Sequence, residues 1–331
     1  MIAAGLADRV SVWARATPAH KKEIVAAIST GDSLCLFCGD GTNDVAALKQ
    51  AAVGIAVMSS TSQDMSGSAV VKKLRISGIV SDVSSLPSRP GDASIAAPFT
   101  YKGDTIRCVP LLVRSGRAAL ALIIQMYKIL AVNSLITAFC LSVLTLKGIK
   151  LGDTQTAIEA LVMSVISFMF SRFPPSKNLP QETFKPVYSV FQTSVVVSIF
   201  AQAGLHLILL AYGQFGLSRI VDTNVDEKFE PSLANTVAFL QLSAAHLSSM
   251  IANFEGPPSL PSIFASRPVM VLVLLVTTCV VLFASGLLPG DMIELVHIEP
   301  SMGMEIVQLV IAHLLGGVGI GYSIRIFFER P

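Results

Sequence analysis

The chain has 331 residues, of which 52% are hydrophobic and only 14% are charged, and its formal net charge is +2. Soluble domains usually carry about 25% charged residues, so this deficit indicates a large membrane-embedded portion. The nearly neutral balance gives no support for nucleic-acid binding. The five cysteines are scattered and odd in number, which excludes the disulfide framework of a small secreted domain.

The N-terminal portion shows strand and helix patterns in alternation, which predicts a parallel sheet. The opening run Met1–Leu6 is too short for a signal peptide, so we expect a cytosolic portion before the first membrane segment. Thr17 is a predicted N-cap and Pro18 a predicted first helical residue. The expected strands are Arg9–Arg15, Ser33–Cys38 and Val53–Met58, and the expected helices are Ala19–Ser29 and Asn43–Ala52.

Two further segments separate this portion from the membrane. Residues 59–90 are rich in serine and have no clear period, so we interpret them as a flexible insertion with at most one strand, around Val70–Ile76. Pro90–Thr100 regains small apolar residues, and residues 91–116 are expected to complete the soluble domain and to link it to the membrane. Cys35 and Cys38 have no further pair of metal-binding residues beside them, so we expect buried thiols rather than a zinc site.

The remainder, residues 117–331, is expected to be a polytopic membrane domain of about six helices. Each apolar stretch approaches or exceeds the roughly 20 residues that cross a bilayer. The first stretch is longer than that, and we expect it to project into the cytosol. The modest bias of basic residues places residues 1–110 and the C-terminus in the cytosol. The stretches are 117–146, 154–173, 189–212, 233–253, 269–288 and 305–327.

The run Gly39–Asp44, with the sequence GDGTND, follows a predicted strand and opens a predicted helix. Ligands bind at the carboxyl ends of parallel strands, where helix N-termini present N–H groups to phosphate. Carboxylates at Asp40 and Asp44 beside an anion require a cation, and oxygen ligands with phosphate suit Mg²⁺. The alternatives are an ordinary Asp/Gly turn and a calcium loop, but a calcium loop needs further acids where Val45–Leu48 stands.

Three blocks of the chain together resemble the phosphorylation domain of P-type ATPases. They are ARATPAHK at Ala14–Lys21, GDGTNDVAAL at Gly39–Leu48 and GIAV at Gly54–Val57, and they occur in the family's order and at fitting spacing. The resemblance implies a partial α/β domain of the haloacid-dehalogenase-like fold in residues 1–58, with its end in residues 91–116. It also implies ATP hydrolysis through an aspartyl-phosphate, with Mg²⁺ as cofactor.

The same resemblance assigns roles to individual side chains. Lys21 matches the lysine that neutralises the phosphoryl group, and its distance from Pro18 favours it over Lys22. Asp40 matches the Mg²⁺ ligand, and Asn43 matches the residue that hydrogen-bonds the phosphoryl oxygens. Asp44 matches a second acid that orders the site and, with Asp40, is assigned to the metal. These roles suit phosphoryl transfer, which depends on positioning and charge neutralisation.

Two motifs of the family do not occur in this sequence, namely the phosphorylated aspartate's D-K-T-G-T and the actuator's T-G-E. We therefore expect the C-terminal portion of an ATPase that is inactive alone and works with a missing N-terminal part, which would bind most of the ATP. A split subunit, a truncated gene and an inactive fragment or membrane scaffold remain open. A free dehalogenase-like phosphatase on a membrane anchor is disfavoured, because no nucleophilic aspartate motif is present.

Further runs narrow the class. Pro90–Thr100, Arg114–Leu120 and Gln125–Lys128 resemble the class V ATPases, and the forms GDASIAAPFT and QMYKIL are most similar to subgroup A. That resemblance implies residence in the endoplasmic reticulum membrane and extraction of misplaced, moderately hydrophobic transmembrane helices. A subgroup B transporter of polyamines or cations is the alternative.

Few polar residues lie in the apolar stretches. Asn133, Glu159 and Gln202 are the candidates for substrate contact, because polar groups at membrane depth are often functional. The alternative is that such groups bridge neighbouring helices. No dense cluster of carboxylates is present, which disfavours a cation pump. The other polar candidates are His206, Gln241, His246 and His313.

Overall fold

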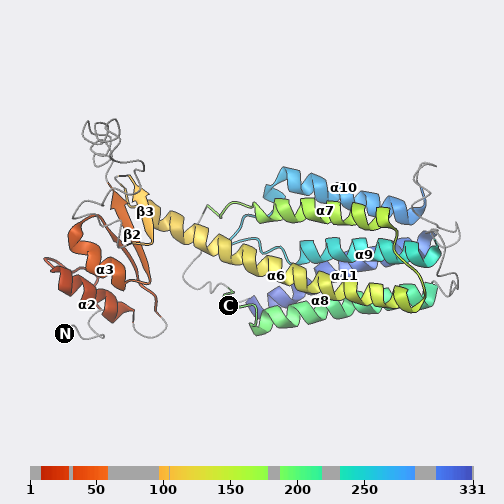
Figure 1. The fold of residues 1–331 in the computed structure, drawn as a ribbon, viewed down its shortest axis with the longest axis horizontal. Coiled ribbons are helices and arrows are strands. Elements are labelled where there is room, and N and C mark those ends of the chain that lie inside the picture. Colours follow the sequence, from red (N-terminus) through yellow and green to blue (C-terminus); the bar gives the residue numbers. More distant parts are fainter. Residues whose placement is uncertain are drawn as a thin grey trace, which may run out of the picture. The chain divides into compact units, whose positions relative to one another are not determined.

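The computed structural model describes residues 9–29, 33–58, 97–103, 105–177, 187–217, 232–287 and 303–329. The chain forms two compact units, Met1–Val113 and Arg114–Pro331, and the boundary between them falls inside helix α6 (Cys108–Leu146). Figure 1 shows the first unit as a small sheet with helices and the second as a bundle of long helices.

The first unit contains a parallel sheet of three strands in the order β1-β2-β3. Strand β1 (Leu36–Gly39) pairs with β2 (Val53–Met58), and β2 pairs with β3 (Phe99–Lys102). The carboxyl ends of all three strands therefore lie at one edge. Helix α3 (Val45–Gln50) connects β1 to β2, and helix α2 (Pro18–Ile28) packs against α3 (Figure 1).

Most of the predicted elements in this unit are confirmed. Helix α2 begins at Pro18, and the Thr17 side chain accepts a hydrogen bond from the backbone N–H of His20 at 3.2 Å. Strand β2 has the predicted bounds, and β1 begins three residues later than expected. The predicted helix Asn43–Ala52 is instead a short 3₁₀ turn, Thr42–Asp44, followed by α3.

Two expectations were wrong. Arg9–Arg15 is not a strand, because no neighbouring strand pairs with it among the described residues and Arg15 has a left-handed φ of 52°. Strand β3 was missed, because it is four residues long and largely exposed, so it lacks an apolar period. The expected insertion at 59–90, including Val70–Ile76, lies outside the described residues.

The second unit is a bundle of long helices that run side by side in Figure 1. They coincide with the six predicted apolar stretches. Within the described residues, five of them are long and apolar enough to cross a membrane, and α9 is not. The helices are α6, α7 (Asp153–Ser171), α8 (Thr193–Tyr212, followed by a π-helical turn at Gly213–Leu217), α9 (Leu233–Ala252), α10 (Arg267–Ser285) and α11 (Gly303–Glu329).

Helix α9 lies at the centre of this unit. Every residue from Ala234 to Met250 is buried. Each of the three apolar clusters of the bundle includes side chains of α9. In the first cluster these side chains pack against α6, α7 and α10. In the second they pack against α10 and α11, and in the third against α6 and α8. The neighbouring helices therefore surround α9, which explains how a helix less apolar than the others is accommodated.

Helix α11 packs tightly against α9 at Gly317, and this contact can be tested by mutation. A Cβ atom there would collide with the Ser248 hydroxyl and lie 2.8 Å from His206 Nε2, whereas a Cβ at Gly319 would meet nothing within 4 Å. We expect Gly317→Ala to destabilise the bundle by about 1–3 kcal/mol through overpacking. Gly319→Ala, the matched control, should unfold at the same temperature or slightly higher, because alanine favours the helix.

The measurement is thermal unfolding of the purified chain in detergent. Equal unfolding temperatures for the two variants would contradict the close packing of α11 against α9.

Candidate functional site

The candidate site is built on the loop that leaves the carboxyl end of β1. Gly39 is the last residue of β1 and is buried, and Asp40 follows it as an exposed residue. A Cβ at Gly39 would lie 2.6 Å from the Cβ of Asp44, so only glycine allows Asp44 to fold back against the strand end. The loop thereby turns the Asp44 carboxylate inward and leaves Asp40 outward.

An ion pair ties this loop to α2. Lys21 Nζ lies 2.7 Å from Asp44 Oδ1, and the exposed fractions of the two side chains are 32% and 9%. Lys21 stands in the first half of α2, and its neighbour Lys22 is exposed. Lys21, and not Lys22, makes the ion pair with Asp44, and the phosphoryl role assigned to Lys21 stays a prediction. The pair also provides the counter-charge that a buried carboxylate requires.

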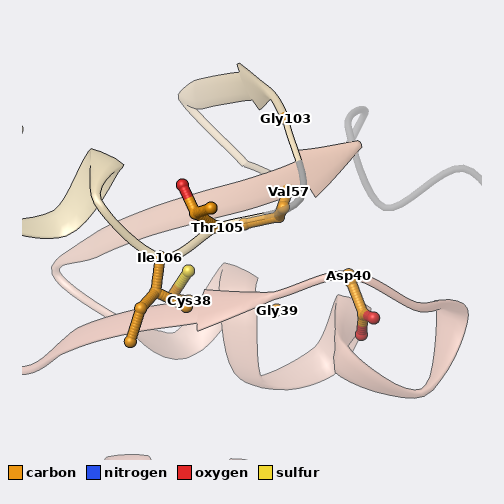
Figure 2. Close-up of a pocket in the computed structure, with 7 residues that line it drawn as sticks. All are labelled: Cys38, Gly39, Asp40, Val57, Gly103, Thr105 and Ile106. Carbon is orange, nitrogen blue, oxygen red and sulfur yellow. The ribbon is translucent and has the colours of Figure 1, made fainter. Parts of the chain in front are cut away.

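A pocket of about 430 Å³ opens at the same edge of the sheet (Figure 2). Figure 2 shows the Cys38 sulfur directed toward the segment with Thr105 and Ile106, while Asp40 lies at the other end of the pocket. Its wall also includes Gly103, which follows β3. The full lining is Cys38, Gly39, Asp40, Val57, Gly103, Thr105 and Ile106.

Cys35 and Cys38, which stand before and within β1, are protonated thiols at neutral pH. Burial raises the pKa of Cys35. Burial also raises the pKa of Cys38, and contact with Cys108 and the charges of Asp40 and Asp44 raise it further. Because thiolates are the form that binds metal or attacks electrophiles, neither Cys35 nor Cys38 is suited to do so here.

The side chains at this edge fit a metal that is held partly by phosphate. Among the described residues, no group of three or more His, Cys, Asp or Glu side chains is gathered to hold an ion. Asp44 is engaged by Lys21, which leaves the exposed Asp40 as the accessible carboxylate. Mg²⁺ is commonly bound through one or two carboxylates, waters and phosphate oxygens, and this donor set matches that mode. The metal roles of Asp40 and Asp44 stay predictions.

The structure brings three of the four predicted phosphoryl-site residues, Asp40, Asn43 and Asp44, into one loop and joins Lys21 to it. Asn43 lies in the 3₁₀ turn and is exposed, as an amide that donates to a phosphoryl oxygen should be. The catalytic assignments of Lys21, Asn43 and Asp44, and the phosphoryl contacts of Lys21 and Asn43, remain predictions.

The three predicted substrate contacts in the membrane unit do not form one site through the hydrogen bonds of the described residues. Gln202 is fully buried and exchanges two hydrogen bonds with Asn253, of 3.1 and 2.8 Å, so it bridges α8 to the end of α9. Glu159 lies 2.7 Å from His246. Asn133 is half-buried in α6, and its Oδ1 atom has no hydrogen-bond partner within the described part of the chain.

Sequence reasoning missed Asn253, the partner of Gln202, and Thr137, the partner of His246. Asn253 follows His246 by seven residues, which places the two on one side at the end of α9, but no local signal links Asn253 to Gln202 on α8. Thr137 accompanies Asn133 on α6 at a spacing of four, but a threonine in an apolar helix is too common to stand out.

His206, His313 and Gln241 form a second buried polar group. The Nδ1 atoms of the two histidines are 2.9 Å apart and their rings are stacked. His313 Nε2 lies 3.2 Å from the Gln241 amide nitrogen, which also donates to the carbonyl of Leu209 at 2.7 Å. The contacts join α8, α9 and α11, as the helix-bridging alternative predicts.

We compared the sequence of the chain with those of known proteins. No family model matches the chain. The endoplasmic reticulum transmembrane helix translocase of Schizosaccharomyces pombe is 29% identical over 75% of this chain and 27% of its own length. The probable manganese-transporting ATPase PDR2 of Arabidopsis thaliana is 30% identical over 78% of this chain and 26% of its own length. The human polyamine-transporting ATPase 13A2 is 27% identical over 85% of this chain and 22% of its own length.

The chain thus spans about a quarter of the length of the curated relatives it matches. Helix translocases and polyamine transporters are both among them, which confirms the recognition made from the motifs. The chain belongs to the class V P-type ATPases.

Proposed function

We propose that the chain is the C-terminal part of a subgroup A ATPase that extracts or translocates moderately hydrophobic transmembrane helices at the endoplasmic reticulum. The observation that carries the proposal is the Lys21–Asp44 ion pair beside the exposed Asp40, at the carboxyl edge of a parallel sheet. The similarity to a helix translocase over three quarters of the chain supports the substrate class.

In this proposal residues 1–58 and 91–116 belong to a phosphorylation domain of the haloacid-dehalogenase-like type, residues 59–90 are an insertion, and residues 117–331 form the membrane domain with six helices. The three parallel strands and the loop after β1 support that fold. Helix α9 counts as a membrane helix because its neighbours shield it from lipid. The phosphorylated aspartate and most ATP contacts would come from the remaining part of the ATPase.

The chemistry of this chain is charge neutralisation and positioning. Asp44 orients Lys21, so that the ammonium group faces a phosphoryl group placed at the loop. Asn43 donates its amide hydrogens to phosphoryl oxygens, and Asp40 provides a carboxylate ligand. A bound Mg²⁺ would neutralise charge on the phosphoryl oxygens. The exposed positions of Asp40 and Asn43 favour these roles.

The composition of the membrane unit favours a peptide substrate over a metal ion. Among the described helices, Glu159 is the one buried acid, and it is paired with His246. Asp153 and Glu305 stand in the first turns of α7 and α11. Removing the water shell of a cation requires several oxygen ligands, whereas a cavity for a helix does not.

Transport of polyamines is the second candidate function, because the human polyamine-transporting ATPase 13A2 aligns with 85% of this chain. A polycation would need acidic side chains, which the described membrane helices largely lack. An inactive fragment or scaffold is the third candidate, and the absence of any phosphoenzyme from a complete protein would favour it.

Lys21 and Lys22 offer a matched pair for the first test. In a complete ATPase we expect Lys21→Met to lower turnover by roughly 10²- to 10³-fold, the loss typical of removing one charge-stabilising donor. Lys22→Met removes the same charge from an exposed neighbour and should leave turnover nearly unchanged. Steady-state ATP hydrolysis is the measurement, and similar losses in both variants would sink the assignment of Lys21.

Asp40 tests the metal role. We expect Asp40→Ala in a complete ATPase to abolish Mg²⁺-dependent turnover, because the exposed carboxylate at the loop is lost. Hydrolysis would be measured across a Mg²⁺ titration, and normal turnover in the variant would contradict the role. The free energy of unfolding should stay within about 0.5 kcal/mol of the parent's, as for other exposed positions.

The substrate class is tested by stimulation. We expect ATP hydrolysis by the complete protein in vesicles to increase when moderately hydrophobic, tail-anchored segments are added. Spermine and Mn²⁺ are the competing additions. Stimulation by spermine or Mn²⁺ alone would refute helix translocation and support the transporter alternatives.

A further inference from the structure

Three helices of the membrane unit meet at a buried pair of titratable side chains. Glu159 Oε1 on α7 lies 2.7 Å from Nδ1 of His246 on α9, and the exposed fractions of these side chains are 8% and 11%. The other ring nitrogen, Nε2, lies 3.0 Å from the hydroxyl of Thr137 on α6. The imidazole thus has Glu159 within ion-pair distance of one nitrogen and a hydrogen-bond partner, Thr137, at the other.

The charge state of this pair is constrained by its surroundings. A carboxylate without a counter-charge is costly in the interior of a membrane protein. If the pair holds one proton in addition to the ring's own N–H, it is neutral overall, whether that proton resides on Glu159 or on His246. If this proton leaves, one negative charge remains buried between α7 and α9.

Thr137 suits both states of the imidazole. A hydroxyl accepts a hydrogen bond from the N–H of a charged ring and donates one to the bare nitrogen of a neutral ring. The change requires only rotation of the hydroxyl hydrogen, so the heavy atoms at 3.0 Å can stay in place. The site therefore accommodates the gain or loss of a proton without repacking α6.

Among the described residues, neither Glu159 nor His246 has a lysine or arginine partner, although α6 also carries Arg114, Arg117 and the buried Lys128. Cys140 of α6 interacts electrostatically with Glu159, and His206 of α8 with His246. His206 is in turn in contact with His313 of α11. The titratable side chains of α10 are Arg267, at its first residue, and the exposed Cys279, and α7 and α9 contribute otherwise only Asp153, in the first turn of α7. Within the described residues, the side chain that can balance a charge on Glu159 is therefore His246 rather than a lysine or arginine.

We propose that Glu159 and His246 form a proton-binding site that holds α7 against α9. The ligand is a single proton, shared by the carboxylate and the imidazole. Glu159 lies about 9 Å along α7 from its first residue, given a rise of 1.5 Å per residue, so the site is near one end of the helix. Separating α7 from α9 would expose the pair to water and release the proton, which couples helix movement to protonation.

The first test does not depend on ATP. Infrared difference spectra of the complete purified protein, recorded against pH, should contain a carboxyl band that disappears in Glu159→Gln. His246→Gln should change the pH dependence of that band, because the carboxyl then lacks the base with which it shares the proton. Glu305→Gln removes an exposed acid from the first turn of α11 and serves as the control, so its spectra should keep the band.

A spectrum without any pH-dependent band specific to Glu159 would overturn the proposal. An unchanged midpoint in His246→Gln would overturn it as well, since the carboxyl would then titrate independently of the imidazole.

The second measurement rests on the proposed ATPase function. The pH profile of ATP turnover should lose one titration step in Glu159→Gln and in His246→Gln, and should keep it in Glu305→Gln. The same step in all three variants would refute the link between proton binding and helix movement. A parent protein without turnover would instead refute the ATPase proposal, while the infrared experiment still decides whether the proton site exists.

Discussion

Polar groups cannot be left in contact with lipid hydrocarbon, and the membrane unit is arranged around this constraint. Helix α9 carries polar side chains along its length, among them Asn235, Gln241 and His246, and every residue from Ala234 to Met250 is buried. The other five helices are apolar enough to face lipid and surround it. Because each apolar cluster includes α9, the position of every other helix is defined against this one.

The same constraint explains the partners of the polar side chains. Gln202 and Asn253 satisfy each other's amide groups, and His206 shares a hydrogen bond with His313. These contacts are neutral and fix helices in place. The Glu159–His246 contact differs, because an acid and a base can exchange a proton there. In our proposal, the Glu159–His246 contact is therefore stable only while it holds a proton.

An element could be predicted from the sequence when neighbouring residues determine it, and could not when residues far away in the chain determine it. Helix α2 was predictable because Thr17 and Pro18 define its start within two residues, and β2 because Val53–Met58 is a continuous run of small and apolar residues. Strand β3 depends on pairing with β2, which lies about 40 residues earlier, and local pattern does not contain that information. The low apolarity of α9 was visible in the sequence, but its shielding by five helices is a property of the packed bundle.

The site in the soluble unit shows the same division between local and distant causes. The order Gly39–Asp44 predicts two carboxylates near an anion, but it does not say which of them remains accessible. The structure answers this through Lys21, which lies 23 residues before Asp44 and neutralises it at 2.7 Å. In its proposed role, Asp40 shares a cation with oxygen atoms from elsewhere, because one carboxylate gives few ligands. Metal affinity should therefore depend on a phosphoryl group at the loop, so that the cation and the phosphoryl group are bound together.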